Sequence, residues 1–333
     1  MSKSQLIYSN SRAKTIEKTL LTRDKILRLI STSNLVDAMR ILQEVGYGVG
    51  ISIDDGFDYN VLLNSEYDKI LSFFKEAMPE GSDLTVFLYL EDANNLKACM
   101  KMKYGGFEDK SLLNSGGHYD KEKMLESILV DNYFSFDAFI KEALEKIDYE
   151  FTLGDKRPYI INTLIDKAIF KTIEKRLKNS RETSLKKYFK TYVEALNFSI
   201  LIRAKKVDAG VKLLREMYLD DGSISLDQFE NLYSQSYEVI QEKYRYKSAG
   251  KIYVNAINEL RETNELIRFE KELDDYLLNM FSLYRNDIFT IGPIISLFLS
   301  KKQEIKMVKL ILVCIKNHVE ENEIRKRLRA LFI

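Results

Sequence analysis

Two stretches of the chain, about a hundred residues apart, carry acidic, amide and basic side chains at the same spacing. "DANNLKACMKMKY" covers residues 92–104 and "EALNFSILIRAKK" covers residues 194–206, and each begins with an acidic residue, Asp92 or Glu194. Asparagine follows three residues later, a basic residue nine residues later and a lysine eleven residues later. This pattern fits either a duplicated functional site or one helix built twice. We favour the second, in which the polar residues serve helix ends and contacts within or between units.

Few other residues have the types and spacing of a catalytic or metal site. His118 and His318 both fall in expected turns and form no H-E-x-x-H pair, so we interpret them as turn residues rather than ligands. Cys99 and Cys314, the only cysteines, lie in apolar helical patterns, which favours buried, reduced thiols. We expect no catalytic residue, no metal ion and no cofactor.

Glycines and paired carboxylates are the remaining candidates for chemistry. "VGYGVG" at 45–50 lacks the lysine and hydroxyl residue of a phosphate-binding loop and follows a helical pattern, so it predicts a helix end and a loop. Asp54–Asp55 and Asp220–Asp221 do not sit among apolar residues that would raise a carboxyl pKa, and we expect solvated loop charges at both. An enzyme whose site is assembled from distant carboxylates is therefore the weakest functional hypothesis.

The elements that position these residues are expected to be helices. Three prolines and 14 glycines in 333 residues leave few helix breakers. Apolar residues recur with a helical period at 159–177, and further helices are expected at 184–205, 239–260 and 263–283. The run at 83–90 is rich in β-branched and aromatic residues, but it continues into the next apolar stretch without a turn, and we interpret it as helix. The predicted fold class is all-α.

Several of these helices have a residue that could cap the N-terminus. Such a side chain accepts a hydrogen bond from a backbone N–H that has no partner within the helix. The expected caps are Thr22, Ser33, Asp120, Ser135 and Ser225. Gln228 follows Ser225 at the spacing of a capping box.

A third copy of the repeat is expected near the C-terminus. "KKQEIKMVKLILVCIK" at 301–316 reads as a helix with an acid, Glu304, and "KNHVEENEIRKRL" follows it. In that second segment Asn317 takes the place of a turn glycine, since both residues tolerate a left-handed backbone, and Glu320 stands at a helix start. Three copies of this size suggest a pseudo-threefold object rather than a solenoid of short repeats. The predicted helical units are residues 1–118, 119–223 and 224–333.

The bulk composition limits the possible partners. The chain has 51 basic and 50 acidic residues, and its net charge of +1 argues against a dominant nucleic-acid surface. No run approaches the roughly 18–20 apolar residues that span a bilayer. The first residues, "MSKSQLIYSNSRAK", lack the apolar core of a signal peptide. We therefore expect a cytoplasmic protein that binds neither nucleic acid nor a small-molecule substrate.

The two ends of the chain are similar to a known family. "YSNSRAKTIEKTLLTRDKILRLISTSNLVDAMRILQEVGYG" at 8–48 resembles the N-terminal signature of the C subunit of bacterial and archaeal V/A-type ATPases, the counterpart of the d subunit of eukaryotic V-ATPases. "FLSKKQEIKMVKLILVCIKNHVEENEIRKRLRALFI" at 298–333 resembles the C-terminal segment of that family. The family often has asparagine where Met307 stands and glycine where Asn317 or His318 stands, so this chain departs from the pattern there.

The resemblance implies a non-catalytic rotor subunit. In that family three similar helical bundles form a funnel around a central opening. The funnel holds the central stalk, built from D- and F-type subunits, and sits on the cytoplasmic side of the membrane ring of c-type proteolipid subunits. Such a subunit is peripheral to the membrane, has no ATP site and transmits torque for ion transport.

Five residues are the candidates for partner binding that the resemblance suggests: Tyr8, Arg12, Lys302, Glu304 and Lys306. Each of these side chains could instead contact another residue of the same chain, and we favour that interpretation over partner binding. The rival functional hypothesis is a soluble all-helical scaffold or regulatory protein unrelated to an ATPase.

Overall fold

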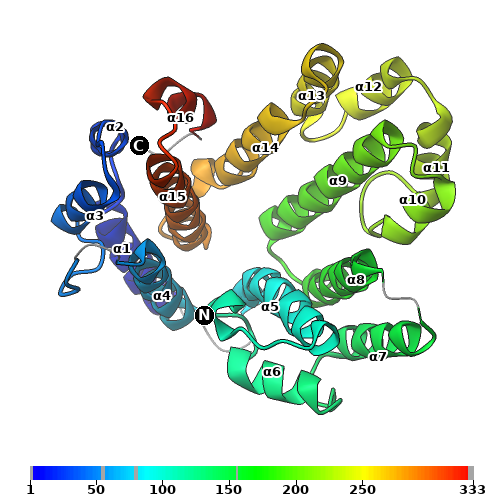
Figure 1. Cartoon of the computed structure of the whole chain (residues 1–333), viewed down its shortest axis with the longest axis horizontal. Helices are drawn as coiled ribbons and strands as arrows, with labels where there is room; N and C mark the ends of the chain where they lie inside the picture. The colour runs from blue at the N-terminus through cyan, green and yellow to red at the C-terminus, as the bar shows by residue number, and fades with distance from the viewer. Residues whose placement is uncertain (1–2, 54–56, 79–81, 155–156, 329–333) are drawn as a thin grey trace. The chain divides into compact units, whose positions relative to one another are not determined.

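A computed structural model describes residues 3–53, 57–78, 82–154 and 157–328. Every regular element in these ranges is a helix, which confirms the all-α prediction (Figure 1). No helix in them is long and apolar enough to cross a bilayer. The chain divides into two compact units, Met1–Ser82 with Glu270–Ile333, and Asp83–Phe269. The expected three repeated units stay a prediction, because compactness and internal repetition are different properties.

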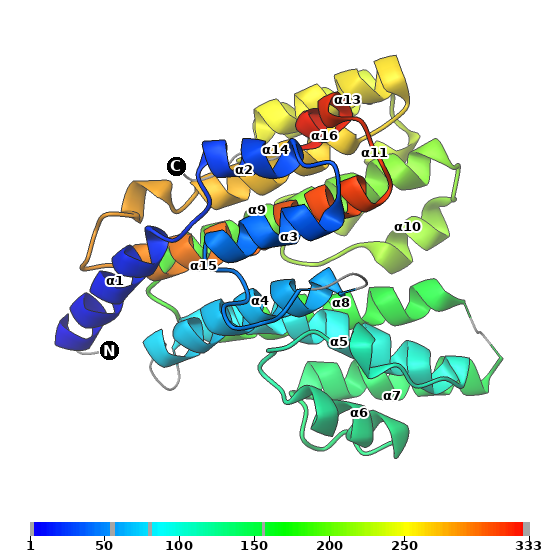
Figure 2. The same ribbon diagram turned by 60° about the vertical axis from the view of Figure 1, so that its left-hand side comes forward.

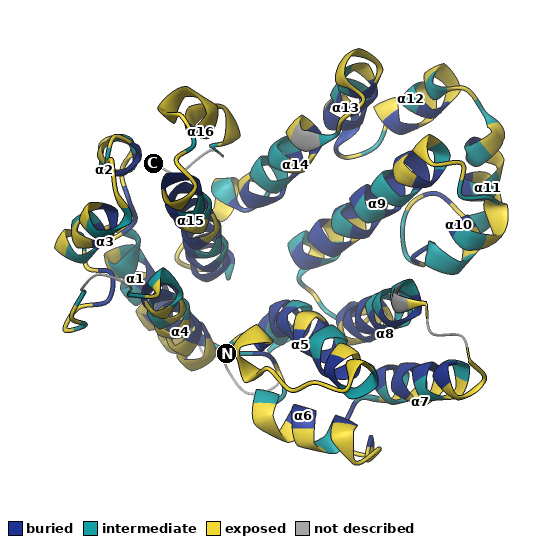
Figure 3. Ribbon diagram, viewed as in Figure 1, coloured by how far each residue is buried: buried dark blue, intermediate teal, exposed yellow. Residues whose placement is uncertain are grey.

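The first unit is built around α15, the longest helix. Its elements are α1 (Lys3–Glu17), α2 (Arg23–Ile30), α3 (Leu35–Glu44), α4 (Tyr59–Ala77), most of α14 (Ile267–Asn279), the 3₁₀ turn η3 (Ser282–Tyr284), α15 (Gly292–Lys316) and α16 (Glu321–Arg327). Helix α15 packs against α1, α2, α3 and α4, and Figure 2 shows α3 and α4 running beside it. Because it has neighbours on several sides, α15 is buried over most of its length (Figure 3). The stacked rings of Phe74 and Phe298, 4.0 Å apart, join α4 to α15.

The second unit contains the two other long repeat helices, α5 and α9. Its elements are η1 (Asp83–Thr85), α5 (Val86–Gly105), η2 (Lys110–Leu112), α6 (Lys121–Leu129), α7 (Ala138–Thr152), α8 (Pro158–Leu177), α9 (Thr183–Lys206), α10 (Val211–Met217), α11 (Leu226–Ser234), α12 (Tyr237–Arg245) and α13 (Gly250–Thr263). Helix α8 contacts both α5 and α7, and these three lie side by side in Figure 1. Helix α9 follows α8 as an antiparallel partner and also packs against α10 and α11.

Most helices occur where the sequence predicts them, with one error. The run at 83–90 is confirmed as helical, since η1 leads directly into α5. The prediction of a single helix at 239–260 is wrong, because this segment forms two helices, α12 and α13, that pack against each other. A Cβ on Gly250 would lie 1.9 Å from the backbone oxygen of Arg245, so this tight turn requires a glycine.

The helix caps follow local chemistry. The side chains of Thr22, Asp120 and Ser225 accept backbone N–H groups in the first turns of α2, α6 and α11, as expected. Ser33 and Ser135 are not caps. Asn34 caps α3 in place of Ser33, and Asp137 occupies the position before α7. In both cases the N-cap position is occupied by a polar residue one or two positions further along the chain.

Candidate functional site

Each of the three repeat acids begins its repeated stretch but lies well inside a longer helix, α5, α9 or α15. In the first copy, Asp92 is fully buried, and its carboxylate accepts the backbone N–H groups of His118 (2.9 Å) and Tyr119 (3.2 Å). These two residues directly precede Asp120, the cap of α6. A Cβ on Gly117 would lie 1.7 Å from Asp92 Oδ1. The acid therefore anchors the loop before a short helix, and the glycine allows the close approach.

The asparagine that follows each of the first two acids makes the same pair of hydrogen bonds. Asn95 Nδ2 donates to the carbonyl of Asn114 (3.1 Å), and Asn95 Oδ1 accepts the N–H of Asn114 (2.8 Å). Asn197 binds the carbonyl and N–H of Leu219 in the same way, at 2.8 and 2.9 Å. Both asparagines are buried, and Leu219 is buried as well, so the second clamp satisfies backbone groups that would otherwise lack partners.

The second and third acids also bind the segment before a capped helix. Glu194 Oε2 accepts the hydroxyl of Ser223, two residues before the cap Ser225. Glu304 Oε2 accepts the N–H of Leu21, which precedes the cap Thr22 of α2. The segment that the third acid binds therefore comes from the N-terminal part of the chain. The expectation that it follows α15 and begins at Glu320 is corrected, although Glu320 does precede α16.

The residues that end the three repeat helices also correspond. Gly106, Asp208 and His318 each stand fourteen residues after their acid and have left-handed backbones, with φ of 67°, 49° and 54°. The sequence pattern predicts this conformation for Asn317, but Asn317 has φ of −96°. The left-handed residue is one position later, because α15 continues through Lys316 before it ends.

The third acid belongs to a buried ionic cluster in the first unit. Lys301 Nζ lies 2.7 Å from Glu304 Oε1 and 3.1 Å from Glu66 Oε2, so one cation stands between two carboxylates. Their side chains are 6%, 1% and 8% exposed. The hydroxyl of Tyr47 also donates to Glu304 Oε1 at 2.5 Å. Burial, and then the negative charge of Glu304, hold the pKa of Tyr47 well above its usual value.

This cluster accounts for Glu304, one of the five residues suggested for partner binding. Since its carboxylate is enclosed and fully used within the chain, it offers nothing to a partner in this conformation. On the same helix, Lys302 is half-buried with Nζ 5.4 Å from the ring centre of Phe298, and Lys306 is exposed. Lys302 and Lys306 as partner contacts stay predictions.

The two N-terminal candidates lie together on α1. Tyr8 is 64% exposed, and the guanidinium of Arg12 lies 5.8 Å from the centre of its ring. Arg12 also forms an ion pair with Glu76 on α4 at 2.9 Å, in which both side chains are largely exposed. Pairs of this kind contribute about 0–1 kcal/mol, so they leave Arg12 available for exchange with another carboxylate. Partner binding by Tyr8 and Arg12 stays a prediction.

The two cysteines and the two histidines lie where the sequence predicts them. Cys99 and Cys314 are buried free thiols, as expected, and burial raises the pKa of Cys99 to about 12. His118 and His318 lie in turns. Within the ranges that the structure describes, no three His, Cys, Asp or Glu side chains are grouped to hold a metal ion.

The glycines of "VGYGVG" are also where the sequence predicts them. They lie in the turn after α3, and all three have left-handed backbones, with φ between 56° and 100°. The pair Asp54–Asp55 lies outside the described residues.

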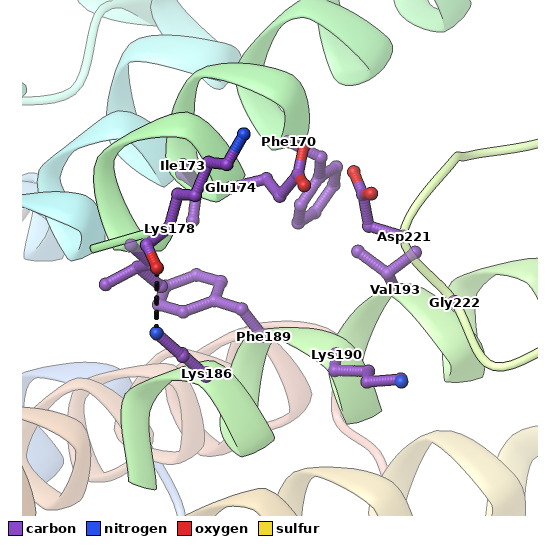
Figure 4. Close-up of a pocket in the computed structure, with 11 residues that line it drawn as sticks. Phe170, Ile173, Glu174, Lys178, Lys186, Phe189, Lys190, Val193, Asp221 and Gly222 are labelled. Atoms are coloured by element: carbon purple, nitrogen blue, oxygen red, sulfur yellow. Dashed lines mark hydrogen bonds between the residues drawn. The ribbon is translucent and has the colours of Figure 1, made fainter. Parts of the chain in front are cut away.

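The pair Asp220–Asp221 differs from expectation, because Asp221 lines a cavity between α8 and α9 (Figure 4). The cavity has a volume of about 370 Å³. Burial, followed by the nearby Glu174 carboxylate, raises the pKa of Asp221 to about 6. No donor in the described part of the chain reaches Asp221 Oδ2, which is buried. Sequence reasoning missed this site because the apolar residues around Asp221 come from other helices.

The sequence did carry one signal for the cavity. Residues 171–190, which end α8 and begin α9, contain eight lysines and arginines and only two acidic residues. This is an uneven distribution for a chain whose total charge is near zero.

Comparisons with known proteins cover nearly the whole chain. The family model described as ATP synthase (C/AC39) subunit matches residues 9–327. The chain is 22% identical to the C subunit of the A-type ATP synthase of Methanocaldococcus jannaschii, over 97% of this chain and 86% of that protein. It is 21% identical to the C subunit of the V-type sodium ATPase of Enterococcus hirae, over 95% of both chains. The C subunit of the A-type ATP synthase of Pyrococcus furiosus is 21% identical, over 96% of this chain and 89% of the relative.

Proposed function

The chain belongs to the ATP synthase (C/AC39) subunit family, and we propose that it is a non-catalytic subunit of a V/A-type rotary ATPase that couples the central stalk to the membrane ring. The observation that carries the proposal is the match of the family model to residues 9–327, together with relatives that are named as C subunits and align over nearly their full lengths. The partners are the D- and F-type stalk subunits and the c-type proteolipid ring. The protein is then peripheral, on the cytoplasmic side of the membrane.

Torque transmission requires a body that resists twisting. The long helices α5, α9 and α15 each fix a distant loop through a buried acid, and two of them add an asparagine clamp. These contacts cross-link the helices to the loops. The hydrogen bonds offset the desolvation penalty of burying the polar groups. Densely packed helical interiors are also poorly compressible. Both properties support a coupling role, because little rotation would be lost inside the protein.

The direct test is binding to the two proposed partners. The purified chain is mixed with the D–F stalk pair and, separately, with the detergent-solubilised proteolipid ring from the same genome. We expect both to bind at micromolar concentration, and the chain to bring stalk and ring together in one complex. If neither binds while circular dichroism shows an intact helical fold, the coupling function is refuted and the scaffold hypothesis gains.

A further inference from the structure

The antiparallel pair α8–α9 carries an uncompensated positive charge. Residues 171–190 contain eight basic side chains but only two acidic ones, Glu174 and Glu182. Two of the basic groups have carboxylate partners elsewhere in the unit, since Lys171 lies 3.5 Å from Asp220 and Arg176 lies 3.5 Å from Asp137. Lys186 donates to the backbone carbonyl of Lys178. In the ranges that the structure describes, the other six basic side chains have no ion-pair partner: Lys175, Lys178, Arg181, Lys186, Lys187 and Lys190.

The cavity between these helices has an apolar floor and charged sides (Figure 4). The floor consists of side chains that are each less than 10% exposed: Phe170, Ile173, Leu177, Phe189 and Val193. Lys178, Lys186 and Lys190 lie at the rim, as do the carboxylates of Glu174 and Asp221, so the rim carries both signs of charge. We call this cavity with its rim the hairpin pocket. A buried carboxylate oxygen without a donor, at Asp221, is part of it.

These features fit a protein segment better than a simple anion. An anionic ligand alone would bring negative charge next to Glu174 and Asp221, which already repel each other. A segment with an apolar anchor can fill the floor, place acidic side chains near the lysines and offer one basic donor to the acid pair. Protein interfaces commonly have this anatomy, in which a central anchor occupies a pocket inside a polar rim.

We propose that the hairpin pocket is a docking site for an amphipathic, predominantly acidic helical segment of another protein in the rotary complex, anchored by one apolar side chain. The inference rests on the proposed function, because it takes the partner to be a component of that complex. Electrostatic attraction to the unpaired lysines speeds the encounter, and burial of the anchor slows dissociation.

The experiment measures the equilibrium affinity of the full-length chain for the purified D–F stalk pair at low and at physiological salt. The first variant, Lys178→Glu with Lys190→Glu, reverses two charges at the rim of the hairpin pocket that have no ion-pair partner. Its matched control, Lys123→Glu with Lys251→Glu, reverses two exposed lysines elsewhere in the same unit. We expect the pocket variant to bind about tenfold more weakly and to lose most of the salt dependence, because it removes rim attraction. The control variant should stay within about twofold of the wild type.

A second variant tests the apolar floor without changing charge. Val193→Phe places a larger side chain in the cavity and should weaken binding by roughly tenfold or more while the salt dependence is kept. Circular dichroism and thermal unfolding check that each variant is folded.

The outcomes separate this inference from the proposed function. Wild-type affinity in the charge and floor variants, or an equal loss in the control variant, would overturn the docking site and leave the coupling function in place. Wild-type chain that binds neither stalk pair nor ring would refute both. Binding of the wild type to vesicles of anionic phospholipid that is lost in the pocket variant, with stalk binding unchanged, would assign the pocket to lipid and also overturn the proposal.

Discussion

Replacing Lys301 by methionine should be among the most destabilising single changes in the first unit. Its ammonium group lies within ion-pair distance of two carboxylates, Glu304 at 2.7 Å and Glu66 at 3.1 Å. Methionine fills a similar volume, so the change mainly removes charge. Removing one partner from a buried ion pair costs about 3–5 kcal/mol, because it leaves a charge uncompensated. Here that charge is on Glu304, since Glu66 keeps Lys69, whose Nζ lies 2.5 Å from Glu66 Oε1. The side chains here are less than 10% exposed, so solvent does little to reduce that cost.

The assay is urea or thermal unfolding of the full chain, followed by circular dichroism at pH 7, with Lys309→Met as control. Lys309 is exposed on the same helix, so its replacement should cost at most about 0.5 kcal/mol. The Lys301→Met variant should unfold roughly 10 °C below the wild type. A deficit below about 1 kcal/mol would refute the ionic account of this cluster.

Three further predictions concern the second unit. Asn197→Ala should cost about 2–4 kcal/mol in chemical denaturation, because it leaves the buried N–H and carbonyl of Leu219 without partners; a cost under about 0.5 kcal/mol would contradict the clamp. The pKa of Asp221 is raised from 3.8 to about 6 in the folded chain, so the fold holds more protons than the unfolded chain between these values. The free energy of unfolding should therefore fall as pH rises through that window. The Asp221→Asn variant should not show this fall, and asparagine tolerates the left-handed backbone at this position (φ 72°). If wild type and variant have the same dependence of stability on pH, the Asp221 carboxyl is solvated. Gly250→Ala should cost more than about 1 kcal/mol in thermal unfolding because its Cβ would meet the backbone oxygen of Arg245, and an unchanged midpoint would mean that the turn between α12 and α13 can shift freely.

Features decided by neighbouring residues could be predicted from the sequence. The caps Thr22, Asp120 and Ser225 depend on a side chain and a backbone N–H two or three residues away, and the structure confirms them. The all-α class followed from helical periodicity and the scarcity of breakers, and it is confirmed as well. Such signals are contained within a single turn or a single helix.

Features decided by distant residues could not be predicted. Glu304 binds Leu21, which is 283 positions away in the sequence, so a search downstream of α15 could only find the wrong segment. The raised pKa of Asp221 depends on its burial against other helices, which local composition does not reveal. The break at Gly250 is a local feature that helical periodicity did not reveal, because the backbone oxygen that a Cβ would meet belongs to Arg245, five residues earlier.

The central claim is that this chain couples ATP hydrolysis to ion movement without catalysing it. The most direct measurement reconstitutes the V/A-type complex in vesicles, with and without this chain, and records ATP hydrolysis and ATP-driven ion uptake together. The account predicts that the peripheral sector still hydrolyses ATP without the chain, that ion uptake is lost, and that adding the chain restores it. Ion uptake at the same rate per ATP in the absence of the chain would contradict the coupling role.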